Sequence, residues 1–219
     1  DKEELRSLAG NDKEIEDRFF KDLSFGTGGI RGVRGIGTNR INKYVIRKAT
    51  QGLANYMLSF DEKLAKEKGI IIAHDCRIGS REYALNTARV MAANGIKAYI
   101  YEDLRSTPEL SFGVRYKGTM AGIVVTASHN PVEYNGYKVY WDDGAQVVDP
   151  HAPSIVAEVN KIQTLEEIKV ISEAEGREKG LIIQLDGKID DDYLDAIKTQ
   201  TLKTDIPGKE NFKIVYTPL

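Results

Sequence analysis

The chain has 219 residues, of which 41% are hydrophobic and 29% are charged. This balance is typical of a globular protein that buries a core, and it excludes a disordered or fibrous chain. Lys and Arg number 31 and Asp and Glu number 33, so the net charge of -2 gives no argument for nucleic acid or an anionic membrane as partner. The single cysteine, Cys76, excludes an internal disulfide and a cysteine-based metal cluster.

Apolar runs, cysteine content and the first residues of the chain bear on where the protein is located. No apolar run approaches the about 20 residues that a membrane-spanning helix needs. With one cysteine in the chain, we expect a reducing, cytoplasmic setting. The first residues, Asp1-Lys2-Glu3-Glu4, lack an initial Met and the apolar core of a signal peptide, so we expect a processed or excised piece of a longer protein.

Helical and glycine-rich patterns occupy the first part of the chain. Residues 5–23 predict one or two short helices. Residues 25–32 are dense in glycine, which lets a backbone turn sharply or approach another group closely. From Tyr44, apolar residues recur at the spacing of one helix face. These residues are Ile46, Ala49, Leu53 and Met57.

Strand and helix patterns alternate in the middle of the chain. Residues 80–94 predict a helix that ends at Gly95, and Thr107-Pro108 predicts the start of another, with Thr107 as the cap. Two strand–helix–strand units in a row predict an α/β fold with a mostly parallel sheet. The apolar runs that predict the three strands are 69–74, 96–101 and 120–127.

The last third of the chain is less regular. Asp142-Asp143-Gly144 predicts a hairpin turn between strands over 137–141 and 145–148. Asp149-Pro150 opens a predicted helix that runs to about Ile162, and a charged helical region follows. After Pro207-Gly208, a new strand begins at Phe212. We therefore expect one domain over 1–207 and the first strand of a second domain within 208–219.

The sharpest candidate for chemistry is the segment Thr126-Ala127-Ser128-His129-Asn130-Pro131, which directly follows the third predicted strand. In open α/β sheets, sites gather at the carboxyl ends of strands. On spacing alone, the segment is equally typical of a Ser/Asn turn that only ends a strand. Three kinds of site remain to be distinguished: a serine hydrolase, a dinucleotide site and a phosphoserine.

A serine hydrolase needs a histidine that reaches the serine oxygen and a third group that orients the histidine. His129 is the residue after Ser128, so we expect its side chain to point elsewhere, which leaves His74 and His151 as candidates. The Gly-x-Ser-x-Gly motif is also missing. These features disfavour hydrolysis.

A dinucleotide site would use the glycine-rich segment 26–31. The dinucleotide-binding fingerprint ends in Gly and follows a strand. Here Arg31 stands at the place of the final Gly, and no strand clearly precedes the segment. The segment therefore fails the fingerprint in both sequence and context.

A serine that carries a phosphoryl group needs cations and amide donors around it, because a phosphoserine brings about -1.5 to -2 charges at neutral pH. The sequence offers Arg31 in the glycine-rich segment, His129 and Asn130 beside the serine, and Lys138 a few residues later. By itself, Lys138 is typical of a solvent-facing lysine on a strand.

The serine segment resembles the signature of the α-D-phosphohexomutases, a family in which this serine is phosphorylated in the active enzyme. The resemblance covers nearly the whole chain and implies the family's first domain, an α/β fold with a mixed, mostly parallel sheet sandwiched by helices. Residues 37–42 resemble an insertion of the phosphoglucomutase and phosphopentomutase branch. Four further segments resemble the family in the expected order: 25–32, 75–80, 135–138 and 213–219.

The resemblance implies a role for each matched residue. Ser128 resembles the phosphoryl donor and acceptor, and His129 a contact to the substrate or phosphate. Lys138 resembles the general base for the sugar hydroxyl, which requires surroundings that favour its neutral form. Arg31 resembles the arginine that holds the transferring phosphate. Three further residues are expected to bind substrate or phosphate: Thr27, Gly28 and Asn130.

The resemblance also implies cofactors and partners. Family members bind Mg²⁺ through the phosphoserine and an Asp-Gly-Asp-x-Asp loop of the second domain, so Ser128 is expected to contribute through its phosphate while the other ligands lie outside this chain. Glucose 1,6-bisphosphate is expected as activator and intermediate. The expected partners are a small sugar phosphate and the remaining domains of the same enzyme. This fragment alone is expected to be inactive.

The resemblance leaves the substrate open. The expected activity is that of a phosphoglucomutase, which interconverts hexose 1- and 6-phosphates through a bisphosphorylated sugar. Phosphomannomutase and phosphopentomutase activities are alternatives, as is a non-catalytic phosphosugar-binding module of the same fold. No nucleic-acid or membrane partner is expected.

Overall fold

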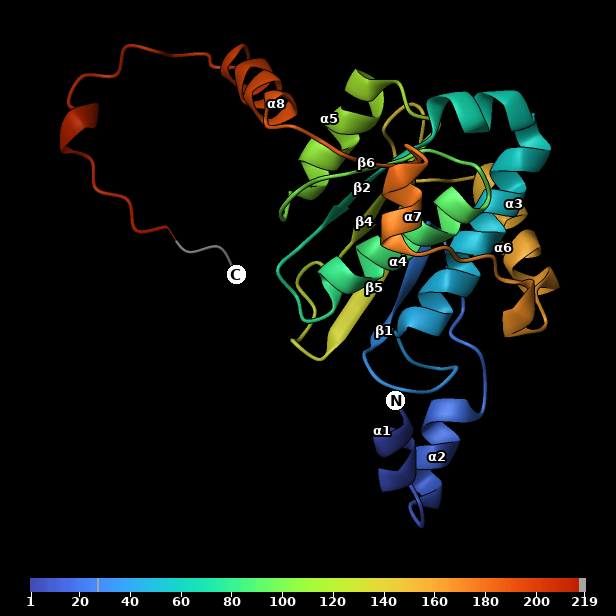
Figure 1. The fold of residues 1–219 in the computed structure, drawn as a ribbon. Coiled ribbons are helices and arrows are strands. Elements are labelled where there is room, and N and C mark those ends of the chain that lie inside the picture. Colours follow the sequence, from blue (N-terminus) through green and yellow to red (C-terminus); the bar gives the residue numbers. More distant parts are fainter. Residues whose placement is uncertain (27, 217–219) are drawn as a thin grey trace. The chain divides into compact units, whose positions relative to one another are not determined.

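The computed structural model describes residues 1–26 and 28–216 (Figure 1). The chain forms two compact units, Asp1–Asp186 and Gly187–Leu219. A six-stranded sheet is the centre of the first unit. Its strands are β1 (Gly29–Val33), β2 (Ile70–His74), β3 (Ala98–Ile100), β4 (Ala121–Val125), β5 (Tyr134–Trp141) and β6 (Ile182–Gln184).

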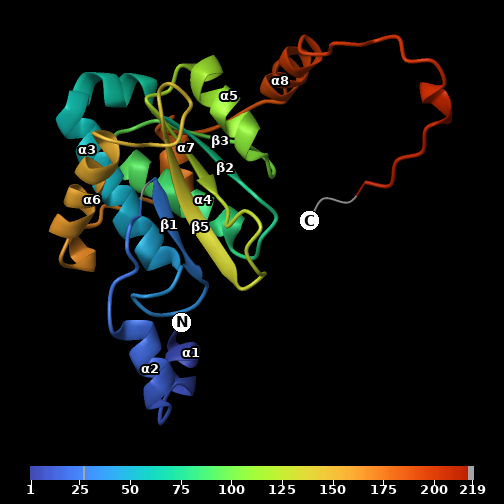
Figure 2. The ribbon, with the colours of Figure 1, turned by 180° about the vertical axis from the view of Figure 1, so that it is seen from behind.

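Helices lie on both faces of this sheet (Figures 1 and 2). The helices of the first unit are α1 (Lys2–Ser7), α2 (Asp12–Phe19), α3 (Lys43–Lys68), α4 (Ser80–Ala93), α5 (Thr107–Lys117), α6 (His151–Lys161) and α7 (Glu173–Glu178), with a 3-10 turn η1 (Leu165–Glu167). The two faces bury alternate residues of the strands. Ile70 and Ile72 of β2 belong to the core beneath α3 and α4, whereas Ile71 lies between them in sequence and faces α5, close to Gly122.

The sheet has the strand order β1-β5-β4-β2-β3-β6. The pairs β4–β2, β2–β3 and β3–β6 are parallel, and β5 is antiparallel to both β4 and β1. Every residue of β2 and β4 is buried, as expected for parallel strands that are covered on both faces. The prediction of an α/β fold with a mixed, mostly parallel sheet between helices is confirmed.

Helix α3 confirms the helix predicted from Tyr44. Its four predicted core residues, Ile46, Ala49, Leu53 and Met57, are all buried. Asn42 begins the helix, because its side-chain oxygen accepts hydrogen bonds from the backbone N–H groups of Tyr44 and Val45. The predicted cap of α5 was one residue too late: Ser106, not Thr107, accepts from the Glu109 N–H, although Pro108 does lie in the first turn.

Two strands were missed in the sequence. Strand β1 lies inside the glycine-rich segment, where Gly29 and Gly32 dilute the apolar pattern, and it forms because β5 pairs with it along its length. Strand β6 has three residues and lies in the region predicted as charged helix. The predicted hairpin is reduced to β5 and an isolated bridge from Tyr140 to Gln146, so residues 145–148 do not form a full strand.

The second unit contains α8 (Lys188–Lys198) and a 3-10 turn, η2 (Lys209–Asn211). Helix α8 has acidic residues in its first turn, which is favourable at the positive end of a helix dipole. Residues 212–216 are exposed and form no strand in this chain. The boundary predicted at 207/208 and the strand of a second domain stay predictions.

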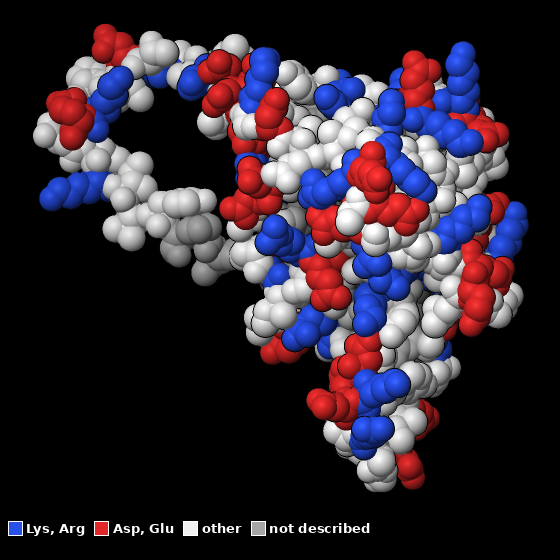
Figure 3. All heavy atoms as spheres, in the orientation of Figure 1, with Lys and Arg blue, Asp and Glu red and all other residues white. Residues whose placement is uncertain are grey.

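The surface carries both signs of charge. Figure 3 shows Lys and Arg side chains interspersed with Asp and Glu on the visible face, in line with the net charge of -2. Among the residues that the structure describes, no helix is both long enough and apolar enough to cross a membrane.

Candidate active site

Ser128 lies in the loop that connects β4 to β5, at the carboxyl end of β4. Its φ of 58° makes it the one non-glycine residue with positive φ in the described chain. This left-handed conformation is uncommon for residues other than Gly, and such residues cluster at functional sites. The Ser128 N–H donates to Oγ1 of Thr126 at 2.9 Å, and the residue is exposed. The loop therefore presents the hydroxyl of Ser128 to solvent.

His129 lies closer to Ser128 than predicted. The Oγ atom of Ser128 is 3.3 Å from Nδ1 of His129, so the expectation that this side chain points elsewhere was wrong. The positive φ of Ser128 turns the chain and brings two successive side chains to the same side. No carboxylate orients the His129 ring within the described residues. Nδ1 of His74 is hydrogen-bonded to the backbone carbonyl of Asp75, and Nδ1 of His151 to the hydroxyl of Tyr56. A Ser-His-acid triad is therefore absent from this region.

Arg31 and Lys138 lie on the same face of the sheet. Ile30 and Tyr137 are paired across β1 and β5, and both side chains are buried beneath α3, where Tyr137 hydrogen-bonds to Thr50. Because successive side chains of a strand alternate, Arg31 and Lys138 face the other way. They are diagonal neighbours, since Lys138 pairs with Gly29.

Arg31 reaches the serine loop directly. Its Nη1 group donates a hydrogen bond to Oδ1 of Asn130 at 2.8 Å, across 99 positions of sequence. The structure therefore brings Arg31, Asn130, Ser128 and His129 together. Lys138 belongs to the same face, two residues beyond Gly136, which pairs with Arg31.

The surroundings of Lys138 favour its neutral form. Partial burial lowers the pKa of the Lys138 ammonium, and the positive charge of Arg31 lowers it further. The Lys138 side chain forms no hydrogen bond or ion pair with the described residues, so no carboxylate offsets these two effects. A lysine in this state is neutral more often than a solvent-exposed lysine, and only the neutral amine can accept a proton.

The glycine-rich segment lies partly away from the serine loop. Thr27 is outside the described residues. Gly28 is buried at the start of β1, and its carbonyl oxygen accepts from the Val139 N–H at 2.9 Å and from Nε2 of Gln146 at 3.3 Å. The serine loop lies beside the other end of β1, where the Arg34 N–H donates to the carbonyl of Glu133. Of the two predicted binding residues that the structure describes, Gly28 and Asn130, it is Asn130 that hydrogen-bonds to Arg31.

The turn after β2 is hydrogen-bonded to the serine loop and to β5, and no role was predicted for its residues. Oδ1 of Asp75 accepts from Oγ of Ser80 at 2.7 Å, and Oγ of Ser80 accepts from Nδ2 of Asn135 at 2.9 Å. Ser80 and Asn135 are fully buried. Arg77 extends from the same turn to backbone carbonyls of the serine loop. The signal in the sequence was a cluster of polar residues directly after a buried strand.

Comparison with known proteins identifies the family. Residues 22–166 match the family described as phosphoglucomutase/phosphomannomutase, alpha/beta/alpha domain I. The chain belongs to this family. Its match covers the whole serine loop, Arg31 and Lys138.

Relatives and solved structures agree with this assignment. A phosphoglucomutase of Staphylococcus haemolyticus is 38% identical over 204 residues, which are 93% of this chain and 36% of the relative. A human phosphopentomutase is 40% identical over 152 residues, 67% of this chain and 25% of the relative. A phosphoglucomutase/phosphomannomutase family protein from Burkholderia thailandensis has the same fold, with a TM-score of 0.63 at 21% identity over 84% of this chain and 37% of that one. The matched part of the chain thus spans between 25% and 37% of the length of these three proteins.

The metal expected from the phosphohexomutase resemblance has no complete site in the described residues. They contain no group of three or more His, Cys, Asp or Glu side chains that could hold a metal ion. Mg²⁺ prefers several oxygen ligands in octahedral geometry. The donor set of this domain therefore does not fit a metal site that the chain forms by itself.

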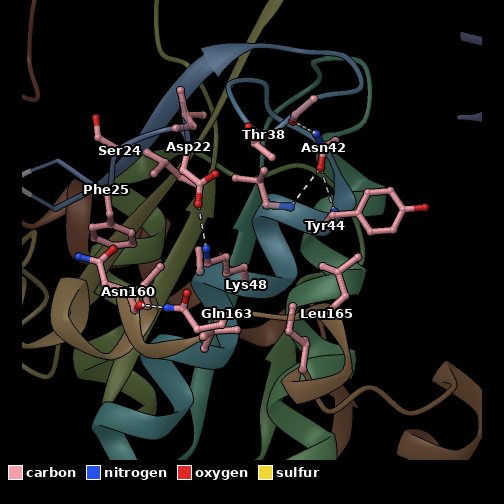
Figure 4. A pocket seen from close by; sticks show the side chains of 18 of the residues that line it. Asp22, Ser24, Phe25, Thr38, Asn42, Tyr44, Lys48, Asn160, Gln163 and Leu165 are labelled. Carbon is pink, nitrogen blue, oxygen red and sulfur yellow. Dashed lines mark hydrogen bonds and ion pairs between the residues drawn. The ribbon is translucent and has the colours of Figure 1, made fainter. Parts of the chain in front are cut away.

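A cavity of this domain I lies on the other face of the sheet. It has a volume of about 550 Å³ and lies among the segments 22–25 and 36–38, the start of α3 and the end of α6 (Figure 4). Its lining is mostly apolar, and Lys48 forms an ion pair with Asp22 at 2.9 Å inside it. Ile30 lines the cavity, whereas its neighbour Arg31 faces the serine loop. The cavity and the candidate active site are therefore separate.

Proposed function

We propose that this chain is the phosphoserine-bearing first domain of a phosphoglucomutase, which interconverts the 1- and 6-phosphates of a hexose. The observation that carries the proposal is the serine loop, in which Ser128 is exposed and has a left-handed backbone conformation. Asn130 of the same loop is hydrogen-bonded to Arg31, and Arg31 shares its face of the sheet with Lys138. Membership of the phosphoglucomutase/phosphomannomutase family and a 38% identical relative named phosphoglucomutase support it.

The proposed reaction moves a phosphoryl group between Ser128 and the sugar. The bond from Oγ of Ser128 to phosphorus breaks while a sugar hydroxyl oxygen bonds to phosphorus. The hydroxyl proton passes to Nζ of Lys138, and Nδ1 of His129, 3.3 Å away, supplies the proton that the departing Oγ needs. After the bisphosphorylated sugar has turned over, the same steps in reverse return its other phosphate to Ser128 and both protons to their starting atoms.

The need to stabilise negative charge explains why Arg31 and Lys138 lie near Ser128. Phosphoryl transfer depends on positioning and on stabilising charge over the phosphoryl oxygens rather than on an unusual nucleophile. Nη1 of Arg31 bonds to Asn130, while its other guanidinium N–H groups have no acceptor among the described residues. These groups are proposed to bind the phosphate on Ser128. The lowered pKa of Lys138 supports its role as base.

We propose that cofactors and partners come from outside the chain. The phosphate on Ser128 contributes one oxygen ligand to Mg²⁺, and other domains of the same enzyme supply the rest. Glucose 1,6-bisphosphate is the proposed activator and intermediate. The proposed partners are a small sugar phosphate and those other domains, and the proposed location is the cytoplasm.

A phosphopentomutase is the second candidate, because a human protein of that name is 40% identical over 67% of this chain. The two activities differ in the sugar, and the residues of this domain that are proposed for phosphoryl transfer are the same for both. A phosphomannomutase uses the same steps with mannose phosphate. A non-catalytic phosphosugar-binding module differs from all three, because its Ser128 never accepts a phosphate.

The test compares substrates on the full-length enzyme. Turnover of glucose 1-phosphate, mannose 1-phosphate and ribose 1-phosphate is measured with Mg²⁺ and catalytic sugar bisphosphate. We expect the highest kcat/KM with glucose 1-phosphate, no turnover by Ser128→Ala, and full activity of the control Ser154→Ala, which removes a serine on α6. A preference for ribose 1-phosphate would replace the proposed sugar, and an active Ser128→Ala enzyme would refute the phosphoserine.

A further inference from the structure

The guanidinium of Arg77 lies on the inner side of the serine loop. Each of its two terminal nitrogens donates two hydrogen bonds to backbone carbonyl oxygens, and its Nε atom lies 3.3 Å from Oδ2 of Asp75. The four carbonyls belong to Pro131 (2.8 Å) and Tyr134 (3.1 Å), bound by Nη1, and to Ser128 (2.9 Å) and Asn130 (2.6 Å), bound by Nη2.

This arrangement occupies every donor of the side chain. A guanidinium has five N–H groups in a fixed planar fork. Four of those of Arg77 bind loop carbonyls, and the fifth faces Asp75. Arg77 therefore has no N–H left for a phosphate, in contrast to Arg31, which has one hydrogen-bond acceptor among the described residues.

The direction of these carbonyls also orients N–H groups. In a planar trans peptide, the C=O and the following N–H point in opposite directions. Because the Ser128 carbonyl points to Arg77, the N–H of His129 points to the opposite side of the loop. That N–H has no acceptor among the described residues. The contact with Arg77 thus turns an unpaired backbone donor outward, beside the hydroxyl of Ser128.

We propose that Arg77 is a positioning residue of this site: it holds the loop carbonyls inward, so that the hydroxyl of Ser128 and the N–H of His129 face the transferring phosphoryl group. The inference rests on the proposed phosphoryl transfer at Ser128. Arg77 acts through the loop and does not touch the phosphate. Its removal lowers the rate of phosphoryl transfer more than the affinity for substrate.

Lysine cannot take over this role. Its ammonium has three donors on one atom, whereas Arg77 serves two pairs of carbonyls from two nitrogens and a carboxylate from a third. A residue that supplied only positive charge near the phosphate would be replaced by Lys with little loss. The Arg77→Lys variant therefore distinguishes a positioning role from a charge role.

The experiment uses the full-length enzyme with Arg77→Gln and Arg77→Lys. The control is Arg89→Gln, which removes an arginine whose Nε donates to the carbonyl of Ile171 at 2.8 Å, away from the serine loop. For each variant we measure kcat, KM for the sugar phosphate, the thermal unfolding midpoint, and the single-turnover rate at which sugar bisphosphate phosphorylates Ser128. If Arg77→Gln does not fold, Arg77→Lys, which keeps the charge and the aliphatic stem, carries the comparison.

Both Arg77 variants are expected to lose about 10²-fold in kcat and in the rate of Ser128 phosphorylation, as for a small misplacement of a reacting group, with KM within about threefold of the wild type. Their unfolding midpoints should stay close to that of Arg89→Gln, which keeps its kcat. Full kcat in Arg77→Lys, or a loss confined to KM, would overturn the positioning role. A wild-type enzyme without turnover would instead refute the proposed function itself.

Discussion

Ser128 combines a reactive side chain with an unfavourable backbone. Its φ of 58° lies in the region that glycine adopts freely and that costs other residues free energy. Hydrogen bonds around the loop hold it there, from the Ser128 N–H to Thr126 and from Arg77 to the Ser128 carbonyl. The strained backbone of Ser128 therefore lowers the stability of the fold at the residue that we propose to carry the phosphate.

Two substitutions of Ser128 measure this cost. Ser128→Gly should be more stable than Ser128→Ala by about 1 kcal/mol, because Gly adopts positive φ without strain and Ala does not. At a position with negative φ, the Ala variant is expected to be at least as stable as the Gly variant. Urea denaturation of the two variants of this chain checks the order. Equal stability, or a more stable Ala variant, would mean that Ser128 is not held in the left-handed region.

Lys138 is the second residue whose position opposes stability. Burial and Arg31 lower its pKa, so the folded protein binds fewer protons than the unfolded one between that lowered pKa and the ordinary value of 10.5. The free energy of unfolding therefore rises with pH in this window, and the cost of the charge is fully present below it.

The Lys138→Met variant removes this cost. At pH 7 its free energy of unfolding should equal or exceed that of the wild type, and the difference should shrink as the pH rises toward 10.5. In the full-length enzyme, the same change should lower kcat by about 10²–10⁴-fold through loss of the base. Urea denaturation at pH 7 and pH 10, with exposed Lys63→Met as control, checks the first part. A variant less stable than the wild type at pH 7 would contradict the account.

At the scale of elements, β5 connects the site to the core. Gly136 lies where the carbonyls of two neighbouring strands converge: an added Cβ would lie 2.6 Å from the oxygen of Thr126 and 2.9 Å from that of Ile30. Gly136 also accepts a hydrogen bond from the Thr126 N–H at 3.1 Å. The absence of a side chain thus lets β1, β5 and the base of the serine loop approach each other.

Gly136→Ala should destabilise the chain by about 1–3 kcal/mol, because backbone atoms on both sides must move. The control is Gly187→Ala, where a Cβ would meet no atom within 4 Å and φ is -68°. Denaturant unfolding measures both. If the two variants lose the same stability, the close approach at Gly136 is not a constraint on the fold.

The sequence predicts those elements whose pattern is local. Strands β2 and β4 are continuous apolar runs, so both strands were predicted, and the helical spacing of the core face of α3 predicted its core residues. Strand β1 was missed because its pairing with β5, and not its own glycine-rich pattern, makes it a strand.

The site shows the same division. Placement of Ser128 after a strand follows from the local sequence, whereas the sign of one φ angle decides that His129 lies beside it. The role of Arg77 depends on carbonyl directions in a loop about 50 positions away, which no local pattern encodes.

At the scale of the whole molecule, this chain is one part of a larger enzyme in our account. It spans 36% of a relative that is named phosphoglucomutase, and its described residues lack a group of three metal-binding side chains. The face with Arg31 and Lys138 provides groups for one phosphate, while the far end of a sugar bisphosphate has no identified contact here. We therefore expect that turnover in the proposed enzyme also depends on positioning of the sugar by other domains.

The isolated chain of 219 residues is accordingly expected to fold without mutase activity. Its core is closed by helices on both faces of the sheet, so circular dichroism should show a cooperative thermal transition. A coupled assay with glucose 1-phosphate, Mg²⁺ and catalytic glucose 1,6-bisphosphate should show no turnover above a Ser128→Ala control. Turnover above that control would mean that the chain contains a complete site.

The most direct measurement is the mass of the full-length enzyme after reaction with glucose 1,6-bisphosphate. We expect one added phosphate, which peptide mass spectrometry assigns to Ser128 and which Ser128→Ala does not acquire. On addition of glucose 1-phosphate the phosphate should leave Ser128 and appear on the sugar. Phosphate on another residue alone, or none on the wild-type enzyme, would refute the proposal that Ser128 carries the transferred group.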